Sequence, residues 1–252
     1  MKTKVYITTT NLIVGTTLKD KSAPEENNMA LHACIDSQAI LENRRELAAF
    51  LKCQLKDFVC ANQTHSANVH KVTRSDIGLG ALQNETAIPN VDALYTDEPG
   101  IVLCSFTADC VPVIFYNEAN GIIGVIHSGW QGTVKEITPK VFEHLAQNEQ
   151  SNPADWHVQI GMALSQEKFE VDEDVYVKFK ALGYADDYMY FNEMTDKYHI
   201  DNQLTVKRQC ERAGIPSDQI SIDSTCTFSS EEGFSYRQDR QAGRHLSFIL
   251  KR

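Results

Sequence analysis

Short apolar runs separated by turn-forming residues dominate the middle of the chain. Runs of strand length, rich in β-branched and aromatic residues, occupy residues 101–107, 111–116 and 121–126. Ala108-Asp109-Cys110 separates the first run from the second, and a turn at residues 117–121 precedes the third, which leads into His127. The second and third runs are expected to pair. That pairing would bring Cys110 and His127 together where strands meet loops, a place where rigid elements can aim side chains into a site.

Helical spacing marks four other segments. Ser37 to Lys52 carries apolar residues on one face, with Ser37 as its N-cap. A second helix is expected over Val134 to Gln147, with Thr138 as cap and Pro139 either in its first turn or at a kink. The last two helices are expected over Asp172 to Leu182, with Asp172 as cap, and over Asn202 to Gly214.

Further strands complete the expected fold. One strand is expected at the N-terminus, before a stretch of loop composition that begins at Gly15, and another at the start of residues 58–69, before a polar loop. Three more are expected over Trp156 to Ile160, Gln219 to Ser224 and His245 to Leu250. Strands and helices are interspersed without a regular βαβ rhythm, which predicts an α+β fold with mixed β-sheets flanked by helices. Because no linker, repeat or low-complexity segment divides residues 1–252, we expect one domain.

Composition excludes several classes of function. A net charge of −10 argues against nucleic-acid or anionic-membrane partners, which require a clustered positive face. Seven cysteines, an odd number with no CxxC spacing, indicate neither a disulfide framework nor a zinc finger. The opening residues lack a signal-peptide core, and no apolar run reaches about 18 residues. We therefore expect a cytoplasmic protein, while its oligomeric state is not indicated.

The candidate chemistry rests on His65, Cys110 and His127. One thiolate and two imidazoles suit Zn²⁺ or a copper ion, and three protein ligands leave a fourth position open for water, phosphate or substrate. Spacing alone does not select this interpretation. The alternative is two histidines in polar loops and a cysteine in the core.

Several ordered motifs resemble one known family. They are Gln63-Thr64-His65, Asp92-Ala93-Leu94 with Thr96, Ala108-Asp109-Cys110-Val111-Pro112 and His127-Ser128-Gly129-Trp130-Gln131-Gly132-Thr133, with further matches at Asn43-Arg44, Gly161, Glu170-Val171, Cys226-Thr227, Ser235-Tyr236-Arg237 and Gly243-Arg244. Together they resemble the YfiH-type family, also called the laccase-domain or multicopper polyphenol oxidase family.

The resemblance implies an α+β fold of YfiH type and a single metal. It implies His65, Cys110 and His127 as metal-binding and catalytic residues. The implied substrate-binding residues are Gln63, Asn43, Arg44, Asp109, Arg237 and Arg244. Members of the family have been described as zinc-dependent purine nucleoside phosphorylases acting on adenosine, inosine and methylthioadenosine, with adenosine deaminase activity. Others have been described as copper-dependent laccases that oxidise phenols.

The chain departs from the family pattern at two cationic positions. Gln131 and Gln238 stand where the family motifs carry arginine, and Ser66 replaces a glycine. If those arginines hold phosphate, Arg237 and Arg244 must bind it alone. Their alternative role is a solvated C-terminal surface that pairs with acidic residues.

Two other assignments also have structural alternatives. Asp109 is expected to support the site rather than bind the metal, because neighbouring residues in an extended segment point to opposite sides; its alternative is an acidic turn residue. Asn43 and Arg44 could instead lie on a solvated helix face.

Chemistry favours the phosphorylase. Reduction of O₂ to water ordinarily needs several coppers with many histidines, and the eight histidines of this chain include no His-x-His pair. We therefore expect a zinc-dependent purine nucleoside phosphorylase acting on small molecules, a nucleoside and phosphate. A copper-dependent phenol oxidase is the alternative, and a non-catalytic or cell-envelope editing role is the third possibility.

Overall fold

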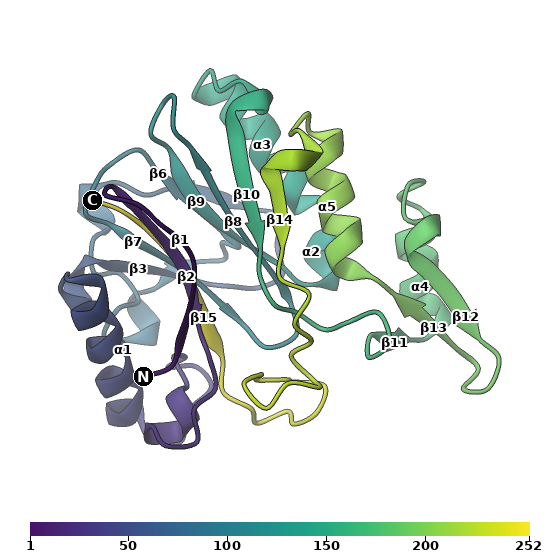
Figure 1. Cartoon of the computed structure of the whole chain (residues 1–252), viewed down its shortest axis with the longest axis horizontal. Helices are drawn as coiled ribbons and strands as arrows, with labels where there is room; N and C mark the ends of the chain where they lie inside the picture. The colour runs from purple at the N-terminus through teal and green to yellow at the C-terminus, as the bar shows by residue number, and fades with distance from the viewer.

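The apolar runs form two six-stranded sheets that pack face to face (Figure 1). The computed structural model describes all 252 residues. The first sheet has the strand order β1 (Thr3–Thr8), β2 (Leu12–Thr17), β15 (His245–Lys251), β7 (Val102–Thr107), β3 (Phe58–Asn62) and β5 (Ile88–Pro89). The second has the order β14 (Ile220–Ile222), β10 (Trp156–Ile160), β8 (Val111–Asn117), β9 (Ile123–Ser128), β6 (Ala93–Thr96) and β4 (Val69–Lys71).

Both sheets mix parallel and antiparallel neighbours, and helices cover their outer faces. Central strands are apolar on both sides because each is buried on both faces. In β7, Leu103 faces the core between the sheets, whereas Cys104 and Phe106 face the core beneath α1 (Ser37–Leu51). On the second sheet, α3 (Ile137–Asn148) and α5 (Asn202–Arg212) pack over Phe115 and Trp156. The predicted α+β fold with mixed sheets and flanking helices is confirmed.

A small lobe projects from one end of the second sheet (Figure 1). It contains a three-stranded sheet of β11 (Glu170–Val171), β13 (Lys197–Ile200) and β12 (Met189–Asn192), together with α4 (Glu173–Lys180). Phe169, Phe179 and Ile200 form its core, and Trp130 packs against it. The sequence pattern predicted α4 but neither β12 nor β13.

The chain crosses from the first sheet to the second three times, between β3 and β4, between β5 and β6, and between β7 and β8. Asp109 turns the last of these corners with a left-handed backbone, φ 85°. The expected pairing of the next two strands is confirmed: β8 and β9 are antiparallel, with Val111 opposite Ser128 and Pro112 opposite His127. Cys110 and His127 therefore lie at the same end of the same strand pair.

Several expected element boundaries were wrong. Asp36, not Ser37, caps α1, because its carboxylate accepts a hydrogen bond from the Gln38 amide at 2.8 Å. Thr138 is not a cap either, because α3 begins at Ile137, and Pro139 lies in the first turn of that helix. Val134, the expected start of this helix, instead ends a separate short helix, α2 (Trp130–Val134). The chain beyond Gly15 continues as strand to Thr17. No helix has the length and apolarity needed to cross a membrane.

Candidate metal centre and active-site cavity

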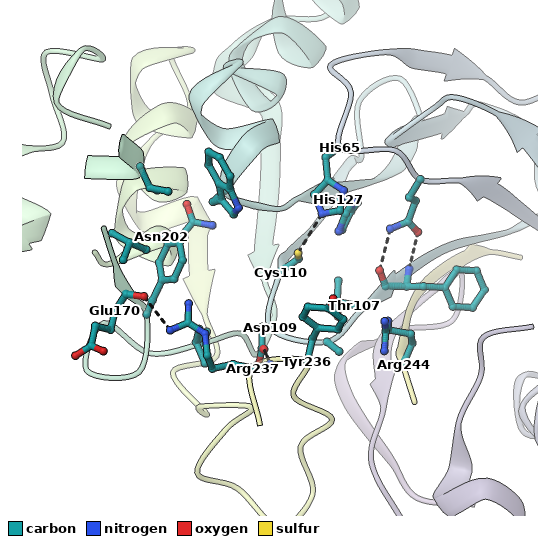
Figure 2. Close-up of a pocket in the computed structure, with 18 of the residues that line it drawn as sticks. His65, Thr107, Asp109, Cys110, His127, Glu170, Asn202, Tyr236, Arg237 and Arg244 are labelled. Carbon is teal, nitrogen blue, oxygen red and sulfur yellow. Dashed lines mark hydrogen bonds between the residues drawn. The ribbon is translucent and has the colours of Figure 1, made fainter. Parts of the chain in front are cut away.

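Three separate segments bring His65, Cys110 and His127 together (Figure 2). His65 lies in the loop between β3 and β4, Cys110 in the link between β7 and β8, and His127 near the end of β9. Their candidate ligand atoms all lie within 4.8 Å of one another, and His65 Nε2 is 3.7 Å from Cys110 Sγ. In the whole chain this is the one group of three or more such side chains that could hold a metal.

The donor set and its dimensions fit a small transition-metal ion. Tetrahedral zinc with bonds of about 2.0–2.3 Å places its ligand atoms about 3.3–3.8 Å apart. The 3.7 Å separation between His65 and Cys110 already has that length. A small contraction would complete the three-ligand shell and leave one position open.

Asp92 holds two of the candidate ligands from behind. Its Oδ1 lies 2.8 Å from His127 Nδ1. Its carboxylate also accepts hydrogen bonds from the backbone amides of Thr64, His65 and Ser66 and from the Ser66 hydroxyl. A carboxylate on the second ring nitrogen fixes the tautomer of a metal-binding histidine and leaves Nε2 free for the metal.

Local backbone geometry is specialised around this cluster. His65 has a left-handed backbone, φ 57°, which is uncommon for a residue with a side chain and which the bonds to Asp92 offset. Gly129 follows β9, where a Cβ would lie 2.5 Å from His65 Cδ2 and 2.9 Å from Cys110 Sγ. Glycine is therefore required there for close approach, since any side chain would displace both ligands.

Electrostatics favour a thiolate and a paired imidazolium in the metal-free site. Burial alone would raise the pKa of Cys110, but His127 and His65 lower it to about 6. Burial alone would lower the pKa of His127, but Cys110 and Asp92 raise it to about 9. Burial also opposes ionisation of Asp92, yet hydrogen bonds from His127 and Ser66 lower its pKa to about 2. The thiolate is the form of cysteine that binds metals.

A cavity of about 710 Å³ opens onto the cluster, a size typical of small-molecule sites. Its walls include all three candidate ligands together with Gln63, Asp109, Arg237 and Arg244. Apolar side chains make up other parts of the wall, namely Phe106, Trp130, Leu164, Phe169, Val171 and Val175. Two buried polar atoms of the wall have no hydrogen-bond partner: Thr107 Oγ1 and Asn202 Oδ1.

The two cavity arginines differ in their surroundings. Arg244 is half-buried and donates from Nη1 to the carbonyls of Ala242 and Gly243. Burial lowers its pKa, while the nearby Cys110 and Asp109 raise it. Arg237 is exposed and donates from Nη1 to the carbonyls of Glu170 at 2.8 Å and Lys168 at 3.4 Å. Figure 2 shows Arg244 and Arg237 on opposite sides of Tyr236. Both guanidiniums bond to carbonyls through Nη1, but only Arg244 is half-buried and close enough to Cys110 for that thiol to affect its pKa, so it is the better placed of the two to meet an anion beside the cluster.

Asp109 and Gln63 line the cavity but are engaged with protein groups. Asp109 accepts hydrogen bonds from the Thr227 hydroxyl and the Arg237 amide, both at 2.7 Å. Gln63 donates to the Phe106 carbonyl and accepts from the Phe106 amide, both at 2.8 Å. In both residues these polar atoms are already bonded to the protein, and both side chains form part of the cavity wall.

Asn43 and Arg44 do not line the cavity, contrary to the expectation that they bind substrate. They are 1% and 2% exposed, so they are not on a solvated helix face either. Arg44 donates to the carbonyls of Met29, Gly80 and Ala81, and its guanidinium lies 5.1 Å from the centre of the Phe106 ring. Both residues fasten α1 to neighbouring loops, because a buried donor must find an acceptor.

Four residues around the cavity were missed as functional candidates. Asp92 begins one of the matching motifs and Thr107 directly precedes another, so their position was a usable signal. His32 lies in irregular chain and Asn202 at the start of a helix, and nothing in the local pattern marks either.

Comparisons with known proteins agree with this geometry. A family profile described as "Multi-copper polyphenol oxidoreductase laccase" matches residues 15–252. The chain is 37% identical over 229 residues to "Purine nucleoside phosphorylase YlmD" of Geobacillus stearothermophilus, covering 89% of this chain and 83% of that one. It is 34% identical over 227 residues to the protein of the same name from Bacillus subtilis, covering 89% and 82%. The crystal structure of the hypothetical protein YfiH from Bacillus licheniformis superposes with a TM-score of 0.91 at 34% identity, covering 96% and 93% of the two chains.

Proposed function

This chain belongs to the family described as multi-copper polyphenol oxidoreductase laccases, and its relatives are named purine nucleoside phosphorylases; from that premise we propose that it is a metal-dependent purine nucleoside phosphorylase. The proposed substrates are adenosine, inosine or methylthioadenosine, together with inorganic phosphate. The observation that carries the proposal is the position of Arg244, a half-buried cation in the same cavity as the His65, Cys110 and His127 cluster.

Phosphorolysis needs two kinds of group, and the cavity offers both. The reaction breaks the bond between ribose C1′ and the purine nitrogen and forms a bond from C1′ to a phosphate oxygen. Phosphate must be held beside C1′, and a guanidinium does this through paired hydrogen bonds. The buried, unpartnered hydroxyl of Thr107 is a further donor in the cavity wall. Apolar side chains such as Trp130 and Val175 provide surface for a flat base.

We propose zinc as the metal, with copper as the alternative, held by His65, Cys110 and His127. Both ions accept a thiolate with two imidazoles. Zinc bound there would supply positive charge and an open coordination position for water, phosphate or substrate. Asp92 would keep His127 oriented, and Gly129 would keep the approach to His65 and Cys110 clear.

Oxidation of phenols is the second candidate function, and the description of the matching family favours it. The arrangement of ligands favours phosphorolysis, because reduction of O₂ to water ordinarily uses several coppers and the chain offers one three-residue ligand cluster. A half-buried arginine also has no evident use in phenol oxidation.

The test starts from protein purified without added metal. Metal content is measured first, and the same sample is then assayed with each nucleoside plus phosphate and with a phenol under air. We expect stoichiometric zinc, phosphate-dependent release of free purine, and no oxidised phenol. Stoichiometric copper with phenol turnover and no purine release would establish the oxidase instead.

The same samples decide two remaining possibilities. Adenosine deaminase activity, which we propose as a side activity of a metal-activated water, would convert adenosine to inosine in the absence of phosphate. A protein that holds its metal but turns over neither nucleoside nor phenol would point to the non-catalytic or cell-envelope editing role.

A further inference from the structure

Asn202 is a buried amide in the cavity wall with an unused acceptor. It is the first residue of α5, follows the capping residue Asp201, and is 6% exposed. Its side chain lines the cavity, and its Oδ1 has no hydrogen-bond partner. A buried acceptor without a donor is costly, so such an atom in a cavity wall calls for a donor from a ligand.

The orientation of the amide is fixed by its other contact. Asn202 Nδ2 donates to the backbone carbonyl of Ser128 at 3.4 Å. A carbonyl oxygen can only accept, so the nitrogen must face Ser128 and Oδ1 must face away from it. Nδ2 keeps a second hydrogen for another acceptor. The side chain therefore offers an acceptor and a donor next to each other.

The surroundings of this amide suit a flat aromatic ring. Trp130, Leu164 and Val175 belong to the same cavity wall. Ser128, which anchors the amide, directly follows His127, so a ring held by Asn202 would remain next to the candidate metal ligands. Figure 2 shows Asn202 on one side of Cys110 and Arg244 on the other. Phosphate and base would then approach the reacting carbon from opposite sides.

We propose that Asn202 is a specificity-determining residue that reads the 6-position of the purine. This inference rests on the proposed function. Oδ1 accepts a hydrogen bond from the 6-amino group, and the second hydrogen of Nδ2 donates to the adjacent ring nitrogen, the pairing by which asparagine recognises adenine elsewhere. A 6-oxopurine such as hypoxanthine places an acceptor at that position, opposite Oδ1. Adenosine-type nucleosides are thereby favoured over inosine-type nucleosides.

The test compares kcat/KM for adenosine and inosine, with the released bases separated by chromatography so that deamination is counted apart. Asn202→Leu keeps the side-chain size and removes both hydrogen bonds. We expect kcat/KM for adenosine to fall about 30-fold, the value of two net hydrogen bonds, and kcat/KM for inosine to stay within about twofold. Asn202→Ala should shift the ratio in the same direction, which excludes an effect of bulk.

Matched controls separate base reading from damage. Asn148→Leu makes the same change at the exposed end of α3 and should alter neither ratio nor metal content. Metal content should also match wild type in both Asn202 variants. An unchanged adenosine-to-inosine ratio, or an equal loss for both nucleosides, would overturn the assignment.

Equilibrium binding separates this inference from the proposed function. Calorimetry with free adenine and free hypoxanthine on metal-loaded protein needs no turnover. Wild type should bind adenine more tightly than hypoxanthine, and Asn202→Leu should remove the difference. A wild type that releases no purine but shows this preference would overturn the phosphorylase and retain base reading by Asn202. Equal binding of the two bases by wild type would overturn the base reading itself.

Discussion

Asp92 links the two histidines of the candidate metal centre. One oxygen lies 2.8 Å from His127 Nδ1, and the carboxylate receives the backbone amides that hold His65 in its left-handed conformation. In Asp92→Asn, the side-chain NH₂ would face backbone amides and a hydroxyl that also donate hydrogen bonds, so some of these bonds would be lost. We expect metal affinity to fall by about 10–100-fold, the usual effect of losing such a supporting group. Competition with a chelator measures it, and an affinity equal to wild type would show that the carboxylate does not support the ligands.

Removing a candidate ligand should have a larger effect. Cys110→Ala and His127→Ala are each expected to abolish stoichiometric metal binding, because a three-ligand site cannot lose one ligand without a large loss of affinity. Cys226→Ser is the matched control: its thiol accepts from the Ser165 amide, outside the ligand cluster, and metal content should persist. Full metal occupancy in either ligand variant would rule out the site.

Arg244 should govern the affinity for phosphate. Loss of a charge-assisted hydrogen bond of about 1.5–3 kcal/mol predicts that Arg244→Ala raises the apparent KM for phosphate by about 10–100-fold, with metal content unchanged. Arg237→Ala should raise KM less or lower kcat, since Arg237 is exposed and its charge is better screened by water. Exposed Arg240, which does not line the cavity, is the control. Phosphate dependence equal to wild type in both cavity variants would remove them from the mechanism.

The sequence predicted most about the candidate site at residues where motif and chemistry coincide. Cys110, His65 and His127 carry thiolate and imidazole donors, the types that zinc and copper select, and the structure gathers them. A motif does not tell whether a residue serves the fold or binds substrate. Asn43 and Arg44 were assigned to substrate, but in the structure both donate hydrogen bonds to buried carbonyls. Asn202 was out of reach, since its importance comes from an amide orientation set by Ser128, a residue 74 positions away in sequence.

At the scale of elements, strongly apolar strands were predictable and half-exposed ones were not. The pairing of β8 with β9 followed from two apolar runs joined by a short turn. Strands β12 and β13 have only four residues each and mostly half-buried or exposed side chains, so neither alternation nor apolarity identifies them. The lobe that forms one wall of the cavity therefore emerges only from tertiary structure.

Gly129, at the junction between β9 and α2, should tolerate no larger residue. Gly129→Ala would put a methyl group 2.5 Å from His65 Cδ2, so we expect loss of most metal binding in a folded protein. Gly132→Ala in the helix that follows meets its nearest atom at 3.4 Å and should bind metal normally. Circular dichroism confirms folding and metal analysis gives the result. Normal occupancy in Gly129→Ala would mean that the ligands can move aside without loss.

At the scale of the whole molecule, buried His245 should make stability depend on pH. Its Nδ1 donates to the Thr17 carbonyl and its Nε2 accepts from the Phe234 amide, both at 2.7 Å. Burial lowers its pKa to about 4, against about 6.5 in the unfolded chain. This contribution is complete above pH about 6.5 and is lost as pH falls toward 4, because only the unfolded chain gains the proton.

Urea unfolding at pH 7 and pH 5 measures this contribution. The histidine accounts for a loss of about 2 kcal/mol between the two values. His245→Asn should be less stable than wild type at pH 7, because buried partners lose their hydrogen bonds, but its pH slope should be smaller by about that amount. Equal slopes for the two proteins would show that His245 is not the titrating group.

The ligands come from segments far apart in the chain, and this also determines when the metal centre can exist. Cys110 and His127 lie at one end of the β8–β9 pair in the second sheet, and Asp92, which directly precedes β6 of the same sheet, holds the loop of His65. The ligand set is complete only when β6, β8 and β9 are paired and that loop is bound to Asp92. An ion bound there would connect these segments and stabilise the folded chain, so the rate of metal uptake by a refolding chain reports when they come together.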